Sequence, residues 1–202
     1  MTDALVARAA ALAAEDRAIL GIAGIPGAGK STLARELVAG LRAAGAAAAY
    51  LPMDGFHLSA AELARRALAD RKGAPETFDV DGFVALLRRV RAAREDVLAP
   101  DYDRDLHDVV PGGLVVPAGA RIVVTEGNYL GVGGGWEAVR PALDALWFLD
   151  VPWEVARERL IERRVATGRL RDDAVAWVDT VDAANARLVG ASRGAADLVI
   201  PG

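Results

Sequence analysis

The fold is decided by one stretch of the sequence, Gly24-Ile25-Pro26-Gly27-Ala28-Gly29-Lys30-Ser31. It follows an apolar run at 18–23, which predicts a buried strand, and it opens an amphipathic helical pattern at 30–44. Glycines at these spacings let successive backbone N–H groups turn toward phosphate oxygens, and the helix that follows adds its positive N-terminal end. The stretch therefore predicts a phosphate-binding loop of the P-loop, or Walker A, type.

This loop predicts a nucleoside triphosphate as ligand, together with Mg²⁺. Lys30 is long enough to reach the β- and γ-phosphates, and the Ser31 hydroxyl is a suitable ligand for Mg²⁺. The residues expected to contact the triphosphate at the loop are Gly24, Pro26, Gly27, Ala28, Gly29, Lys30, Ser31 and Thr32.

Apolar runs alternate with helical patterns along the rest of the chain. Further strands are expected at 46–51, 121–125, 145–151 and 197–200. Helices are expected at 1–18, 60–69, 81–94, 153–166 and 173–189. A short hairpin flap is expected between 108–110 and 114–116, across the Pro-Gly-Gly at 111–113. This order indicates an α/β fold, a P-loop NTPase domain spanning 1–202 with a parallel sheet sandwiched by helices.

Composition excludes several functional classes. The 202 residues include no cysteine and two histidines, which excludes thiolate metal sites and a histidine-rich metal cluster. The formal net charge of −4 argues against a general nucleic-acid binder. No apolar run approaches the roughly 20 residues of a membrane span, so we expect a cytoplasmic protein.

Two large classes of P-loop protein lack support in this sequence. Switch GTPases need an Asn-Lys-x-Asp motif, and the only lysine besides Lys30 is Lys72, in Asp-Arg-Lys-Gly. Transport ATPases need an LSGGQ-like signature, which is absent. The strand expected at 121–125 leads into Glu126, whose carboxylate is suited to hold the water shell of the magnesium ion.

Asp54 is a candidate catalytic base. It follows the second expected strand and would lie at the carboxyl edge of the sheet beside the loop. A kinase needs a carboxylate there that orients the acceptor hydroxyl and takes its proton. The alternative is an Asx turn or a helix cap before Ser59, and spacing alone does not decide between the two roles.

An arginine-rich segment at about 160–173 is a candidate lid. It contains Arg163, Arg164, Arg169 and Arg171, with Gly168 as a hinge. Arginines on a lid would offset the charge of a transferring phosphoryl group and exclude water from it. The alternative is that they form a solvated helix face.

With these motifs in place, the sequence resembles the uridine kinase, phosphoribulokinase and bacterial pantothenate kinase superfamily. Within it, the chain is most similar to bacterial nucleoside/nucleotide kinase proteins, a group that includes proteins described as uridine kinases or fructokinases. The resemblance covers 19–200. Besides the loop, it is carried by Asp-Gly-Phe-His at 54–57, Thr-Phe-Asp at 77–79, Pro-Asp-Tyr-Asp at 100–103, Thr-Glu-Gly-Asn-Tyr at 125–129 and Thr-Gly-Arg at 167–169.

The resemblance implies roles for particular residues. Asp54 would be the base, Glu126 would serve the metal, and Arg163, Arg164 and Arg169 would serve the phosphates. The residues implied on the acceptor side are Asp54, His57, Asp79, Tyr102, Arg104, His107, Tyr129 and Asn185.

Some of these assignments have alternatives. Val80-Asp81 stands where uridine kinases have His-Pro, and Arg104 stands where they have an aromatic residue. His107 is a loop residue in a second alignment, and Tyr129 fits either the core or the site. The identity of the acceptor therefore stays open.

The resulting expectation is an ATP-dependent, Mg²⁺-dependent kinase that phosphorylates a hydroxyl of a nucleoside-like or pantothenate-like acceptor. A sugar kinase of the same fold is one alternative. A P-loop ATPase or regulatory module with no small acceptor is another. The sequence does not distinguish a monomer from a homodimer.

Overall fold

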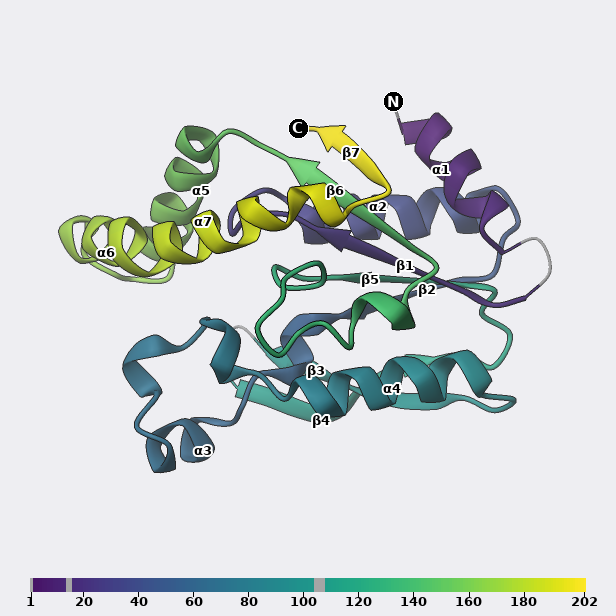
Figure 1. Cartoon of the computed structure of the whole chain (residues 1–202), viewed down its shortest axis with the longest axis horizontal. Coiled ribbons are helices and arrows are strands. Elements are labelled where there is room, and N and C mark those ends of the chain that lie inside the picture. The colour runs from purple at the N-terminus through teal and green to yellow at the C-terminus, as the bar shows by residue number, and fades with distance from the viewer. Residues whose placement is uncertain (1, 14–15, 104–107) are drawn as a thin grey trace.

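The computed structural model describes residues 2–13, 16–103 and 108–202 (Figure 1). At its centre lies a parallel sheet in the order β2-β5-β1-β6-β7. Its strands are β1 (Ala18–Ala23), β2 (Ala48–Pro52), β5 (Ile122–Glu126), β6 (Ala145–Asp150) and β7 (Leu198–Pro201). The strand runs are almost continuously apolar because both faces of the sheet are covered, and the expected α/β fold is confirmed.

Helices and a hairpin form the layers on the two faces (Figure 1). On one face α2 (Lys30–Ala43) packs on the sheet, and α1 (Thr2–Ala11) packs on α2. On the other face lie α4 (Val80–Ala92) and a two-stranded antiparallel sheet of β3 (Val97–Asp103) and β4 (Asp108–Val116). The apolar stripes of α2 and α4 supply the core between the layers, with Leu37, Leu41, Phe83 and Leu87 fully buried.

The remaining helices lie toward the carboxyl ends of the strands. They are α3 (Ala60–Arg65), α5 (Trp153–Ala166), α6 (Arg171–Trp177) and α7 (Ala183–Ala191). In Figure 1, α5, α6 and the start of α7 project together from one end of the sheet. Within the described part of the chain, no helix has the length and apolar character needed to cross a membrane.

The hairpin differs from the expected one. Residues 108–116 form a single strand, β4, whose partner is β3, so the prediction that 108–110 pairs with 114–116 is wrong. Pro111, Gly112 and Gly113 lie within β4 instead of forming its turn. The register shifts between Ala99, which pairs with Leu114, and Asp101, which pairs with Val110, so residues 111–113 of β4 bulge opposite Pro100.

Several helix boundaries also differ. The helix expected at 173–189 is two α-helices, α6 and α7, joined by a π-helical stretch at Val178–Asp182. The helix expected at 60–69 ends at Arg65, and the one expected at 1–18 ends at Ala11.

The register of the sheet assembles the functional loops. Glu126, the last residue of β5, lies between Ile22 of β1 and Pro52 of β2. The phosphate loop follows β1 and Asp54 follows β2, so all three features share the carboxyl edge of the sheet. Ligands of open parallel sheets bind at this edge.

Candidate active site

The phosphate loop has the backbone that its glycines predict. Gly27 and Gly29 have φ angles of 79° and 96°, in the left-handed region that favours glycine. A Cβ on Gly27 would also lie 2.5 Å from the Ala156 carbonyl oxygen of α5, so a side chain there would clash with backbone. The loop ends at Lys30, where α2 begins with its N–H groups facing the cleft edge of the sheet.

Lys30 lies buried at the base of the loop, with 7 % of its surface exposed. Its Nζ donates to the Ile25 carbonyl at 3.0 Å and to Oδ1 of Asn128 at 2.7 Å. Burial lowers the pKa of Lys30, and the negative charges of Glu126 and Asp54 oppose that change. The lysine is therefore positioned as a buried cation beside two carboxylates.

Glu126 is the centre of a small oxygen-rich cluster. Its Oε1 accepts from the Ser31 hydroxyl at 2.8 Å and from the Tyr50 hydroxyl at 2.7 Å, and 4 % of the residue is exposed. Burial raises the pKa of Glu126, and the charge of Asp54 raises it further while Lys30 lowers it. A cation placed beside Glu126 would relieve this repulsion.

This cluster fits a magnesium ion. Among the described residues no group of three or more His, Cys, Asp or Glu side chains could hold a metal by itself. Mg²⁺ in nucleotide sites uses one or two protein oxygens together with phosphate oxygens and waters, and Ser31 and Glu126 offer a hydroxyl and a carboxylate 2.8 Å apart. The residues present therefore match the ion that the loop implies.

Asp54 lies in the same cleft and follows β2, which neighbours β5 on the side opposite β1. It belongs to a 3-10 turn at Met53–Phe56 that follows β2 directly. The helix that starts at Ala60 is capped by Ser59, whose Oγ accepts from the Glu62 amide at 3.2 Å. The helix-cap alternative for Asp54 is therefore wrong, and its carboxylate lines the cleft.

One cleft of about 830 Å³ brings most of the predicted site residues together. The predicted residues that line it are Pro26, Gly27, Gly29, Lys30, Ser31, Thr32, Asp54, His57, Tyr102, Glu126, Arg163, Arg164, Arg169 and Asn185. They come from the loop, the 3-10 turn after β2, β5, the hairpin and the α5–α7 segment, so residues far apart in the sequence share one concave surface.

Arginines of α5 and the following turn face the phosphate loop across the cleft. Arg159 donates to the Ala28 carbonyl at 3.3 Å, which ties α5 to the loop. Arg164 pairs with Asp182 at 3.1 Å, and its guanidinium carbon lies 5.0 Å from the centre of the Trp177 ring. All three predicted lid arginines line the cleft; Arg164 is half-buried there, whereas Arg163 and Arg169 are exposed to solvent, so their role in a lid stays a prediction.

Aromatic side chains form the opposite wall. The His57 ring stacks on Phe78 with centroids 4.0 Å apart, and the Tyr102 ring lies 5.1 Å from His57. Burial lowers the pKa of His57 to about 4, with a smaller contribution from the positive charge of Lys72. His57 is therefore a neutral, flat surface at physiological pH.

Two predicted acceptor-side residues lie elsewhere. Asp79 is exposed and caps α4 by accepting from the Gly82 amide at 3.0 Å. Tyr129 is fully buried among Phe78 and Trp136, and its hydroxyl donates to the Gly73 carbonyl. Arg104 and His107 lie outside the described residues.

The structure adds residues that the sequence patterns did not select. Asn128 holds Lys30, and Tyr50 holds Glu126. Others line the cleft without belonging to the predicted set: Arg35, Lys72, Phe78, Arg159, Trp177 and Asp182. Asn128 stands two positions after Glu126 in the Glu-Gly segment, so it was within reach of the motif, whereas the other residues come from separate parts of the chain.

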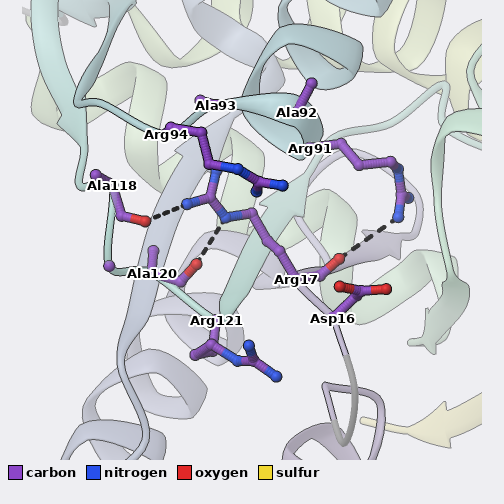
Figure 2. A pocket seen from close by; sticks show the side chains of 10 residues that line it. Asp16, Arg17, Arg91, Ala92, Ala93, Arg94, Ala118, Ala120 and Arg121 are labelled. Atoms are coloured by element: carbon purple, nitrogen blue, oxygen red, sulfur yellow. Dashed lines mark hydrogen bonds between the residues drawn. The ribbon is translucent and has the colours of Figure 1, made fainter.

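A second hollow, of about 470 Å³, lies at the opposite edge of the sheet (Figure 2). Arg17 occupies its centre and donates to the carbonyls of Val90, Ala118 and Ala120. Arg91 donates to the Arg17 carbonyl at 3.5 Å and also pairs with Asp144. These guanidinium groups join the segments that lead into β1 and β5 to the end of α4, which is a structural role.

The fold and the cleft define a class of protein. A phosphate loop at the carboxyl edge of a parallel sheet, with a carboxylate and arginines across the same cleft, is the arrangement of a P-loop kinase. The chain belongs to the phosphoribulokinase/uridine kinase family, whose model matches residues 19–202.

Individual relatives agree with this assignment. A "Putative uridine kinase" of Schizosaccharomyces pombe is 33% identical over 92% of this chain and 83% of its own length. A pantothenate kinase of Paenarthrobacter aurescens is 38% identical over 54% of this chain and 34% of its own length. The crystal structure of a "putative fructose transport system kinase" from Silicibacter sp. TM1040 has a TM-score of 0.92 and 37% identity, covering 100% of this chain and 99% of that one.

The chain is therefore a small-molecule kinase, a phosphotransferase that uses a hydroxyl as acceptor. The names of its relatives point to three different acceptors, so similarity to them does not identify the acceptor of this chain.

Proposed function

We propose that this chain transfers the γ-phosphoryl group of Mg²⁺-bound ATP to a hydroxyl of a nucleoside-like or pantothenate-like acceptor. The observation that carries the proposal is the shared cleft, in which Asp54 lies with Lys30, Ser31 and Glu126 on one wall and the lid arginines on the other. A sugar kinase of the same fold is the second candidate, because the fructose-related structure matches the whole chain.

The triphosphate would lie along residues 24–32. The backbone N–H groups of the loop and the N-terminal end of α2 would hold its β- and γ-phosphates. Nζ of Lys30 has three N–H donors and uses two of them, on the Ile25 carbonyl and Asn128, so it would donate the third to a phosphate oxygen. Mg²⁺, when bound by Ser31 and Glu126, supplies positive charge to the phosphate oxygens.

Asp54 would act on the acceptor. Its carboxylate would accept a hydrogen bond from the acceptor hydroxyl and take the proton as the hydroxyl oxygen bonds to the γ-phosphorus. The bond between that phosphorus and the bridging oxygen of ADP breaks in the same step. Lys30 and the arginines would stabilise the negative charge on the transferring group.

The segment at about 160–173 would serve as the lid. Arg163 and Arg164 precede the hinge glycine and Arg169 follows it, and all three line the cleft. The hinge, Gly168, has a φ of 88°, and no atom lies within 4 Å of the place where a Cβ would stand. Closure over ATP would bring these charges to the γ-phosphate and exclude water, which protects ATP from hydrolysis.

The alternative of an ATPase or regulatory module predicts a different reaction. It needs no acceptor wall, whereas this cleft continues past Asp54 to His57, Tyr102 and Asn185. We expect ADP release to be slow with ATP and Mg²⁺ alone and to rise at least tenfold with one member of a panel of nucleosides, pantothenate and sugars. If water remains the only acceptor across that panel, the kinase proposal for this site is wrong.

A further inference from the structure

The cleft is strongly basic within an acidic protein. Among the described residues that line it, seven side chains are cationic and three are acidic, whereas the whole chain has a formal charge of −4. The cations are Lys30, Arg35, Lys72, Arg159, Arg163, Arg164 and Arg169, and the acids are Asp54, Glu126 and Asp182. A triphosphate on the loop explains the cations nearest to it, but Lys72 lies on a different wall.

Lys72 stands on the acceptor side. Its Nζ lies 5.3 Å from the centre of the Tyr102 ring, and its positive charge acts on His57. The backbone beside it is fixed from two directions, since the Gly73 carbonyl accepts from Tyr129 and from Nδ2 of Asn185 at 3.4 Å. The lysine therefore projects from an anchored segment into the part of the cleft that the acceptor would occupy.

Arg164 and Trp177 add two buried donors to the same cleft. Neither Nε of Arg164 nor Nε1 of Trp177 has a hydrogen-bond partner among the described residues, and both atoms are buried. Both groups are donors only, so an oxygen of a ligand would satisfy them. The nearby acid, Asp182, is paired with Arg164 and leaves the pair without net charge.

We propose that the acceptor is an anion, a molecule that carries a carboxylate or phosphate group besides its reacting hydroxyl, and that Lys72 binds this group. The inference rests on the proposed function and specifies its acceptor. It distinguishes hydroxy acids and sugar phosphates, which fit this wall, from uncharged nucleosides and sugars, which offer Lys72 no anionic oxygen.

The test compares acceptors in pairs that differ in charge alone as far as chemistry permits. Suitable pairs are pantothenate with pantothenol, glycerate with glycerol, fructose 6-phosphate with fructose, and uridine 3′-monophosphate with uridine. ADP release is measured with ATP and Mg²⁺ held constant. We expect the anionic member of one pair to have a kcat/KM roughly 10- to 100-fold above its neutral partner, the range of one hydrogen bond to a charged group. The pairs also separate a carboxylate from a phosphate.

Variants identify the side chain responsible. Lys72→Met should lower kcat/KM for the anionic acceptor roughly 10- to 100-fold, and Lys72→Arg should restore most of it. Neither change should alter the KM for ATP. The matched control is Arg71→Met, which removes the adjacent positive charge from an exposed residue paired with Glu76 outside the cleft and should change nothing.

The outcomes distinguish a wrong acceptor class from a wrong proposed function. If a neutral acceptor is phosphorylated as efficiently as its anionic partner and Lys72→Met has no effect, the acceptor is uncharged and the inference is wrong, while the kinase stands. If no acceptor of either kind stimulates ADP release, the proposed function itself is wrong, and the inference falls with it.

Discussion

Replacing Tyr50 by phenylalanine tests the cluster around Glu126. The change removes one hydroxyl, which donates to Glu126 Oε1 at 2.7 Å, and keeps the ring that lies 5.2 Å from the Arg35 guanidinium carbon. Burial and the Glu126 charge raise the pKa of Tyr50, so this hydroxyl stays protonated and donates at any pH used in an assay. Without it, Ser31 is the one remaining side-chain donor to that oxygen among the described residues.

The magnitude follows from the type of bond. A hydrogen bond to a charged group contributes about 1.5–3 kcal/mol, and the half-buried position of Tyr50 lets water recover part of it. We therefore expect a cost of about 1–2 kcal/mol in holding Glu126 oriented, or roughly a 5- to 30-fold rise in the Mg²⁺ concentration needed for half-maximal turnover. The KM for the acceptor should not change.

The assay is ADP release as a function of Mg²⁺ at saturating ATP and acceptor. Tyr129→Phe is the matched control, because it removes a tyrosine hydroxyl whose partners are the Gly73 carbonyl and the Asn128 side chain rather than Glu126. An unchanged Mg²⁺ dependence in Tyr50→Phe, or an equal shift in Tyr129→Phe, would show that the Tyr50 hydroxyl does not orient Glu126 for the metal.

Three further predictions concern the loop and the acceptor wall. Lys30→Ala should raise the KM for ATP and lower kcat at least 100-fold, and unchanged kinetics would remove the loop from the active site. Asn128→Ala, which removes the 2.7 Å bond to Lys30, should raise the KM for ATP by a smaller factor, roughly 3- to 10-fold; an effect as large as that of Lys30→Ala would mean that Asn128 contacts ATP itself. The pKa of His57 is lowered to about 4 in the folded state, so the wild type should lose up to roughly 3 kcal/mol of stability as pH falls from 6.5 through 4. His57→Gln should reduce that loss, measured as denaturant midpoints against pH, and identical profiles would contradict the burial of a neutral ring.

The parallel sheet was predictable because strands that are buried on both faces have almost continuously apolar sequences. The strand expected at 18–23 is β1 with the same bounds, and each of its six residues is buried. Strand β3 was missed since Pro100, Asp101 and Asp103 resemble a loop. Only pairing with the partner strand β4, in which Asp101 lies opposite Val110 and Asp103 opposite Asp108, makes those residues extended.

The residues of the candidate site likewise fall into two groups, those within a local sequence motif and those whose roles depend on long-range contacts. The loop, Glu126 and Asp54 were selected because each lies within a local motif at the end of a strand. Glu126, Asp54 and the loop residues Pro26, Gly27, Gly29, Lys30 and Ser31 line the cleft, whereas Gly24 and Ala28 do not. Tyr50, Lys72 and Trp177 were not selected, since their roles depend on contacts between segments that are distant in the chain. Asp79 shows the converse, because its motif position is also that of an N-cap, and the structure shows its carboxylate on the Gly82 amide.

Single-turnover kinetics of Asp54→Asn test whether this cleft transfers a phosphoryl group to a hydroxyl with Asp54 as the base. The substitution keeps the shape of the side chain and removes its capacity to take a proton. We predict ATP affinity within about threefold of the wild type and a transfer rate lower by roughly 10²- to 10⁴-fold, the usual contribution of a general base. Transfer at a near-normal rate by Asp54→Asn, with the acceptor that the panel identifies, would show that Asp54 is not the base.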